Sequence, residues 1–224
     1  IRTITNVIGC LEGTDRPEEL VVVGNHRDAW VFGGVDPSSG TACLMELARA
    51  LGEAKRAGFR PRRTVILGNW DAEEFTLTGS TEWGEENKER LKQNLVAYIN
   101  VDSAASGRNF EVQGVLVDEA LKGVEDPVEK KPVYEVWKAG VRGASGQKQE
   151  GRVEPIGSGS DHAVFLQHIG APALDMSFSG DYGVYHSVYD NYYWMTHFGD
   201  PGMKYLATMA KIWADRVRVN AITS

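Results

Sequence analysis

Three short apolar segments constrain the fold of this chain more than any other feature. Residues 20–24, 64–68 and 96–101 are rich in valine, isoleucine and leucine, and polar residues bound each segment. They are too short for buried helices and have the length of buried strands. Helical patterns lie between them, at 41–55 and 81–91. Because strands that alternate with helices form parallel sheets covered on both faces, the sequence predicts an α/β fold.

The remaining periodic segments complete this expected fold. Two more strands are predicted at 4–11 and 171–176, and helices are predicted around 134–138, at 161–168 and at 201–217. The stretch 125–152, rich in Lys, Glu and Gly, is expected to contain a flexible loop after the first of these helices. A chain of 224 residues is long enough for one such domain. We therefore expect a single three-layer αβα domain with a mostly parallel, mixed central sheet.

Composition argues against several classes of protein. The formal net charge of -7 does not suit a general nucleic-acid-binding surface, so no nucleic-acid partner is expected. Two cysteines, Cys10 and Cys43, are too few for a disulfide framework. No run of about 18 uncharged apolar residues is present. Since the chain begins at Ile1, close to an expected strand and without a charged leader and apolar signal core, we interpret it as a piece of a longer protein. Any targeting signal or membrane anchor would then lie outside these residues, and the location of the protein stays open.

Candidate metal ligands follow the three apolar segments directly. His26 comes just after the first, Glu73 and Glu74 after the second, and Asp102 after the third, while Asp36 lies in a Gly-rich loop that begins soon after His26. The carboxyl ends of parallel strands meet at one edge of a sheet, so these side chains are expected to converge. Any one of them alone would be interpreted as a solvated side chain or a helix cap. Together, imidazole and carboxylate groups without cysteine favour a catalytic zinc site, with manganese or cobalt as alternatives.

Two further roles are suggested by position. Because Glu73 and Glu74 are adjacent, they point in different directions, so one can bind a metal while the other accepts a proton from water. The alternative is that both are an acidic start to the following helix. Asp28 could accept a hydrogen bond from the ring nitrogen of His26 that faces away from the metal, or it could simply form a turn. His162, His168 and His197 remain competing ligands at this stage.

Several motifs resemble the catalytic domain of glutamate carboxypeptidase II-like proteins. They are GNHRDAW at 24–30, FGGVDP at 32–37, NWDAEE at 69–74, GSTEW at 79–83, NVD at 100–102 and YHS at 185–187. This family is a branch of the co-catalytic zinc aminopeptidase clan that also includes the transferrin receptor. The resemblance covers most of the chain and is weak only at 110–152. It implies the zinc-dependent exopeptidase fold and hydrolysis of a small peptide near a chain end, with a carboxypeptidase favoured over an aminopeptidase.

The same resemblance implies a role for each site residue. Two zinc ions would share Asp36 as a bridging ligand. His26 and Asp102 would complete one metal site, and Glu74 and His186 would complete the other. Glu73 would be the general base, and Tyr185 would donate a hydrogen bond to the oxyanion that forms on the substrate.

This sequence also departs from the family pattern. Full-length relatives carry a protease-associated domain and a helical dimerisation domain, which help to form the pocket for a terminal glutamate, and residues 1–224 contain neither. The expected arginine-rich stretch is replaced by residues 173–180, which contain no arginine, and Ser160 replaces an asparagine. These departures argue against a preference for acidic peptides. In the full-length protein the resemblance implies a homodimer, a possible membrane-anchored ectodomain, and a structural calcium ion for which Glu82 and Glu85 match ligands.

Two other functions could be served by a similar fold or a similar metal site. A catalytically silent receptor-like or scaffolding homologue related to the transferrin receptor would share the fold, but it would have no reason to retain all five ligands and Glu73. A two-metal phosphoesterase would use a similar metal pair, but the sequence contains no phosphate-binding Gly-Lys loop. The presence of all five candidate ligands together with Glu73 therefore favours a zinc exopeptidase.

Overall fold

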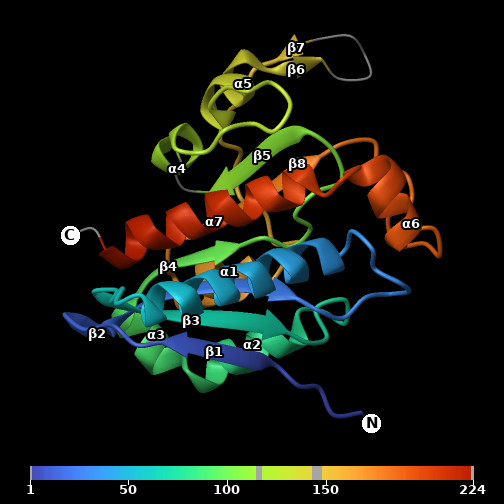
Figure 1. Cartoon of the computed structure of the whole chain (residues 1–224). Helices are drawn as coiled ribbons and strands as arrows, with labels where there is room; N and C mark the ends of the chain where they lie inside the picture. Colours follow the sequence, from blue (N-terminus) through green and yellow to red (C-terminus); the bar gives the residue numbers. More distant parts are fainter. Residues whose placement is uncertain (1, 115–117, 143–147, 223–224) are drawn as a thin grey trace.

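The three apolar segments form neighbouring parallel strands in the middle of the sheet. In the computed structural model, which describes residues 2–114, 118–142 and 148–222, these strands are β2 (Arg16–His26), β3 (Arg63–Trp70) and β4 (Leu95–Asn100). β2 lies between β3 and β4 and runs parallel to both (Figure 1). Their carboxyl ends therefore lie side by side at one edge of the sheet.

The outermost strand on each side of the sheet is antiparallel to its neighbour. β8 (Ala173–Ser179) extends the parallel set beside β4, whereas β1 (Val7–Leu11) pairs antiparallel with β3 and β5 (Asn109–Gly114) pairs antiparallel with β8. The described part of the chain thus contains a six-stranded sheet in the order β1-β3-β2-β4-β8-β5. The predicted mostly parallel, mixed sheet is confirmed.

Helices cover both faces of this sheet, so the three-layer αβα architecture is also confirmed. α1 (Ser38–Arg56) and α7 (Lys204–Ile222) lie in front of the sheet in Figure 1, and α2 (Thr78–Glu86) and α3 (Lys88–Asn94) lie behind it. The π-helical segment η1 (Val164–Ile169) packs with α2 and α3. Side chains of β2 alternate between the two cores, with Val21 and Val23 in one and Leu20 and Val22 in the other. Burial on both faces is the reason this strand is a continuous apolar run.

Smaller elements complete the described structure. α4 (Asp118–Lys122), α5 (Val133–Ala139), β6 (Val141–Arg142) and β7 (Lys148–Gln149) form a group beyond β5, and α6 (Tyr192–Trp194) continues into the π-helical segment η2 (Met195–Gly199) (Figure 1). The helix expected around 134–138 corresponds to α5. The flexible loop expected after it, up to residue 152, includes residues 143–147, which lie outside the described residues, but its described part contains the strands β6 and β7. Within the described residues, no helix is both long and apolar enough to cross a membrane.

Several sequence-based boundaries were wrong, and backbone angles explain two of them. The single helix expected at 81–91 is two helices, because the backbone of Asn87 leaves the helical conformation and both ends α2 and begins α3. The helix expected from residue 201 begins at Lys204, because Gly202 and Met203 have positive φ angles of 84° and 53°. The carboxylate of Asp200 then accepts hydrogen bonds from the backbone N–H groups of Lys204 and Leu206, as a helix cap does.

Phe165 provides a test of the core behind the sheet. Its ring is fully buried and stacks on Tyr98 with centroids 3.9 Å apart. We expect Phe165→Ala to lower the free energy of unfolding by about 3–5 kcal/mol, because it removes a buried ring and leaves a cavity. The exposed Phe198 is a matched control, for which replacement by alanine should change stability by less than about 0.5 kcal/mol. Urea unfolding of both variants measures this difference, and equal midpoints would contradict this account of the core.

Candidate metal centre

The register of the parallel strands brings the predicted ligands to one edge of the sheet. His26 is the last residue of β2, and Gly24 of the same strand pairs with Gly68 of β3 and with Asn100 of β4. Glu73 and Glu74 follow the end of β3, and Asp102 follows the end of β4. The segments that carry these residues are far apart in the sequence, but they all begin at the same edge of the sheet.

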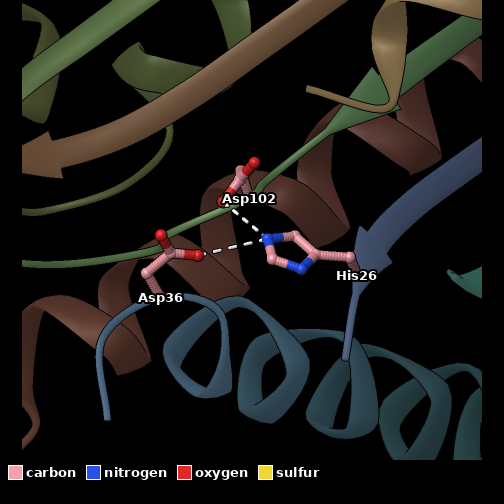
Figure 2. Close-up of side chains that lie close together, drawn as sticks. All are labelled: His26, Asp36 and Asp102. Carbon is pink, nitrogen blue, oxygen red and sulfur yellow. Dashed lines mark hydrogen bonds and ion pairs between the residues drawn. The ribbon is translucent and has the colours of Figure 1, made fainter. Parts of the chain in front are cut away.

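A first cluster forms around the ring of His26. Its Nε2 atom lies 3.2 Å from Asp36 Oδ1 and 3.1 Å from Asp102 Oδ1 (Figure 2). His26 and Asp36 are buried, with exposed fractions of 1% and 6%. The three ligand atoms all lie within 4.8 Å of one another, a spacing that could hold a metal ion.

A second cluster forms on the other side of Asp36. His186 Nε2 lies 3.1 Å from Asp36 Oδ2 and 3.3 Å from Glu74 Oε2. Asp36 therefore directs one carboxylate oxygen toward each histidine and belongs to both clusters. This is the arrangement required of a carboxylate that bridges two metal ions.

The crowding of carboxylates controls protonation in these clusters. Burial opposes charging of His26, but hydrogen bonds to Asp102, Asp28 and Asp36 outweigh this effect and raise its pKa. Burial also raises the pKa of Glu73 to about 8, and the negative charges of Asp102, Asp161 and Glu74 act in the same direction while His26 opposes them. These carboxylates thus require positive charge nearby, which either protons or metal cations can supply.

The chemistry of the donor atoms fits zinc. Glu74 Oε1 is buried and has no hydrogen-bond partner among the described residues, and Asp36 Oδ1 has only its contact with His26 Nε2. Buried acceptors of this kind are rare unless a cation or a water satisfies them. The remaining donors are imidazole nitrogens and carboxylate oxygens, with no sulfur, which is typical of catalytic zinc sites.

Glu73 lies beside the clusters without belonging to either. Its Oε2 atom is 4.0 Å from His26 Nε2, whereas the neighbouring Glu74 takes part in the second cluster. The two adjacent glutamates therefore differ in their relation to the candidate ligands. A carboxylate that lies beside the ligands without joining them is placed to accept a proton.

Asp28 contacts the site in a different way from the one predicted. The ring Nδ1 of His26 is 3.0 Å from the backbone carbonyl oxygen of Asp28, whereas the nearest oxygen of the Asp28 carboxylate is 3.6 Å away. That carboxylate accepts hydrogen bonds from the backbone N–H groups of Glu73, at 2.9 Å, and Glu74, at 3.2 Å. Asp28 therefore fixes the imidazole through its backbone and fixes the glutamate loop through its side chain.

Asp190 is a positioning residue that the sequence did not reveal. Its buried carboxylate accepts hydrogen bonds from the backbone N–H groups of Val35, at 2.8 Å, and Asp36, at 3.2 Å, and from the Tyr182 hydroxyl, at 2.7 Å. Val35 and Asp190 are 155 positions apart in the chain. Asp190 thus ties the loop that carries Asp36 to the segment that carries His186. Only its proximity to His186 in the sequence could have suggested this role.

Asp102 is held by the side chains of Ser160 and Asn25. Ser160 donates a hydrogen bond of 2.5 Å to Asp102 Oδ2, and Asn25 donates one of 2.8 Å to the Asp102 backbone carbonyl. Gly40 packs so closely against this carbonyl that a Cβ atom would lie 2.1 Å from it. Ser160, which the sequence singled out only as a departure from the family pattern, therefore orients a candidate metal ligand.

Strained backbone is concentrated at the site. His186 has a φ of 55°, and Ala72, Thr76 and Leu77, which flank the two glutamates, have φ of 57°, 68° and 57°. Such left-handed conformations cost about 1–3 kcal/mol each for residues other than glycine and persist only where the surroundings enforce them. Their position next to the ligands indicates that the site is held rigidly by its neighbours.

The competing histidines lie outside both clusters. His162 is buried and its Nε2 lies 3.2 Å from the Gly157 carbonyl oxygen, His168 lies 3.9 Å from Glu85, and His197 stacks on Tyr193. The part of the chain that the structure describes therefore brings only His26 and His186 into candidate metal-binding groups.

Tyr185 lies next to the second cluster, and its ring stacks on His186 with centroids 3.6 Å apart. Burial raises the pKa of its hydroxyl to about 12, and the nearby carboxylates, Asp36 first among them, act in the same direction. At neutral pH Tyr185 is therefore protonated and able to donate a hydrogen bond.

This chain is similar in sequence to a family of peptidases and to curated proteins of plants and animals. Residues 6–197 match the model of peptidase family M28. The chain is 48% identical over 218 residues to the probable glutamate carboxypeptidase LAMP1 of Arabidopsis thaliana, a match that covers 95% of this chain and 31% of that protein. It is 37% identical over 222 residues to the aminopeptidase NAALADL1 of Mus musculus, covering 90% of this chain and 29% of that protein. The chain thus spans less than a third of the length of these curated relatives.

The fold is shared with solved zinc aminopeptidase structures. A zinc aminopeptidase from Bacillus subtilis superimposes with a TM-score of 0.71 at 17% sequence identity, covering 98% of this chain and 50% of that one. An aminopeptidase from Aneurinibacillus sp. strain AM-1 gives a TM-score of 0.67 at 18% identity, covering 98% and 48%. At these identities the likeness concerns the fold alone.

The role of Asp190 can be tested by metal binding. We expect Asp190→Asn to weaken zinc affinity by about 10- to 100-fold, the range typical of residues that orient metal ligands, because the amide can no longer accept all three hydrogen bonds. Competition with a chromophoric chelator measures this affinity. Asp181→Asn is the matched control, since Asp181 is an exposed aspartate in the same segment. Equal zinc affinities of the two variants would show that the hydrogen bonds accepted by Asp190 are not needed for metal binding.

Proposed function

Because the chain belongs to peptidase family M28, we propose that it forms the catalytic domain of a zinc exopeptidase with two metal ions. In this proposal His26 and Asp102 would hold one zinc, Glu74 and His186 would hold the other, and Asp36 would contribute to both sites. The single observation that carries the proposal is the position of Asp36, whose two carboxylate oxygens face two different histidines. A site for a single metal would not require one carboxylate to face two histidines.

The residues around the clusters supply the remaining chemistry. Zinc, when bound, polarises the carbonyl of the peptide bond and lowers the pKa of the attacking water. Glu73 accepts the proton of that water and transfers it to the departing amine, as a general base and then a general acid. The Tyr185 hydroxyl donates a hydrogen bond to the oxyanion of the tetrahedral intermediate. Asp28 keeps Glu73 in place by binding its backbone N–H group.

We favour a carboxypeptidase over an aminopeptidase. The support is the higher identity to a relative named as a probable glutamate carboxypeptidase, 48%, than to one named as an aminopeptidase, 37%. Because the chain spans less than a third of these relatives, we propose that residues 1–224 are the catalytic part of a longer protein. For that longer protein we also propose a homodimer, a structural calcium ion beside Glu82 and Glu85, and a protease-associated domain.

A substrate panel tests the reaction class. Dipeptides, N-acylated dipeptides and a generic phosphodiester are assayed with the zinc-loaded chain. Release of a terminal residue from N-acylated dipeptides supports a carboxypeptidase, because an acylated amino terminus excludes aminopeptidase action. Turnover of the phosphodiester without peptide turnover would refute the proposed function. A zinc-loaded chain inactive on every substrate would favour the receptor-like alternative.

Glu73→Gln separates the general base from the ligands. We expect zinc content near that of the unchanged chain together with a loss of turnover of at least about 100-fold, since an amide cannot accept the proton from water. Zinc content is measured by atomic absorption and turnover by release of the amino acid. Loss of metal instead would indicate that Glu73 and Glu74 have the opposite roles.

His186→Ala tests the two-metal count. We expect the variant to retain about one zinc per chain, because only the second cluster loses its imidazole. The matched control is His197→Ala, which removes a histidine that lies outside both clusters. If the His186 variant kept the full stoichiometry while the His197 variant lost metal, the ligand assignment would have to move to His197.

A further inference from the structure

The loop that carries the two candidate glutamates is strained. This loop, residues 71–79, runs from the end of β3 into the first turn of α2, and we call it the glutamate loop. Ala72, Thr76 and Leu77 hold positive φ angles of 57°, 68° and 57°. Such left-handed conformations cost free energy for residues other than glycine, so they persist only where neighbouring groups enforce them. The groups that enforce them here therefore also set the positions of the glutamates.

The two ends of the glutamate loop lie against each other. The backbone N–H of Gly79 donates a hydrogen bond of 3.0 Å to the carbonyl oxygen of Asp71. A Cβ atom at position 79 would lie 2.2 Å from that oxygen and 2.4 Å from Oδ1 of Asn6, so the contact requires glycine. Asn6 is therefore packed directly against the point where the loop closes.

Asn6 binds both ends of the loop with one side chain. Its Oδ1 atom accepts a hydrogen bond of 3.0 Å from the backbone N–H of Asp71, and its Nδ2 atom donates one of 2.8 Å to the carbonyl oxygen of Gly79. Asn6 directly precedes β1, and the pairing of Val7 with Asn69 leads the N-terminal segment past the end of β3 (Figure 1). Because an amide carries a donor and an acceptor on one rigid group, a single residue can hold both ends of the loop.

A second set of contacts joins the same segment to the neighbour of His26. The Asp71 carboxylate accepts hydrogen bonds from the backbone N–H of Thr5, at 2.7 Å, and from Nη2 of Arg27, at 2.9 Å. Nη2 and Nε of Arg27 also donate to the carbonyl oxygen of Thr5, at 2.7 and 3.1 Å. Arg27 directly follows His26 in the chain. Residues 5 and 6 therefore contact both the glutamate loop and the residue next to a candidate ligand.

We propose that residues 5 and 6, which we call the N-terminal clasp, position Glu73 and Glu74 at the metal centre, with Asn6 as the principal positioning residue. This inference rests on the proposed function, because it takes the roles of the two glutamates from it. The Asp28 carboxylate holds the loop at the backbone N–H groups of the glutamates, and the clasp holds it at its two ends. A general base displaced by about 1 Å can lose about 100-fold in rate, so small movements of the loop affect turnover.

Hydrogen exchange tests the clasp without metal or substrate. The backbone N–H groups of Leu77, Thr78 and Gly79 donate hydrogen bonds within the loop, at 2.7, 3.0 and 3.0 Å, so their exchange reports its opening. In the metal-free chain we expect Asn6→Ala to accelerate exchange of these three amides about 10-fold, because two hydrogen bonds at the ends of the loop are lost. The amides of β4, which is separated from β1 by β3 and β2, should exchange as in the unchanged chain.

Asn94→Ala is the matched control. The side chain of Asn94 donates its hydrogen bond to the carbonyl oxygen of Arg90 in the same helix, so its loss should leave exchange in the loop unchanged. A second variant, Arg27→Ala, removes the contacts with Thr5 and Asp71 and leaves Asn6 in place. It should accelerate the same loop amides by a smaller factor. Unchanged exchange in the loop in both clasp variants, or an equal acceleration in β4, would overturn the inference.

Metal binding and kinetics separate a positioning role from a general loss of stability. In Asn6→Ala we expect one zinc ion to bind about 10- to 100-fold more weakly and the other to bind as before, since Glu74 belongs only to the second cluster. Turnover should fall by about 10- to 100-fold through kcat with KM little changed, because the displaced Glu73 acts in the reaction step. Equal weakening of both zinc ions together with a lower urea midpoint would assign Asn6 a purely structural role and overturn the inference.

The exchange measurement also separates this inference from the proposed function. A glutamate loop that opens more readily in Asn6→Ala supports the clasp even in a chain that hydrolyses no peptide. A loop that stays closed in that variant refutes the clasp and leaves peptide hydrolysis to be judged by the substrate panel.

Discussion

The crowding of carboxylates around Asp36 is the constraint on which the rest of the site depends. In each cluster the ligand atoms lie within 4.8 Å of one another, and two carboxylates belong to each. At that spacing two negative charges repel each other by roughly 3–4 kcal/mol at an effective dielectric constant of about 20. Folding can hold them together only if positive charge compensates. The raised pKa of His26 and the unpaired buried Oε1 atom of Glu74 are two consequences of the same constraint.

Polar groups help to fix the loops that carry these charges. Asp190 binds the backbone at Asp36, Asp28 binds the backbone at Glu73 and Glu74, and Ser160 binds Asp102. Each of these groups restrains a ligand that would otherwise move away from its charged neighbours. Left-handed backbone at His186 and beside the glutamates is tolerated for the same reason, since the surrounding hydrogen bonds determine the conformation. A preorganised site of this kind loses little free energy in rearrangement when a cation or substrate binds.

The candidate ligands account for a reaction class and leave the choice of substrate open. In the proposed function the ligands, Glu73 and Tyr185 would act on any peptide bond, so they do not explain why relatives of similar sequence are named as carboxypeptidases in some cases and as aminopeptidases in others. Selectivity would have to come from surfaces next to the clusters, because a shared fold does not fix the substrate.

The sequence by itself determined the layers of this fold and the positions from which the ligands emerge. Apolar periodicity is a local property, so it revealed β2, β3 and β4, and the residues that follow each strand could be named as candidates. It did not reveal β5, the break at Asn87, or the delayed start of α7, since weak patterns and single backbone angles decide these features. Nor could it reveal that the Asp28 carboxylate binds the glutamate loop, or that Asp190 joins segments 155 positions apart. Those contacts form only when the chain has folded, because a hydrogen bond depends on the distance between atoms in space, which the order of residues does not contain.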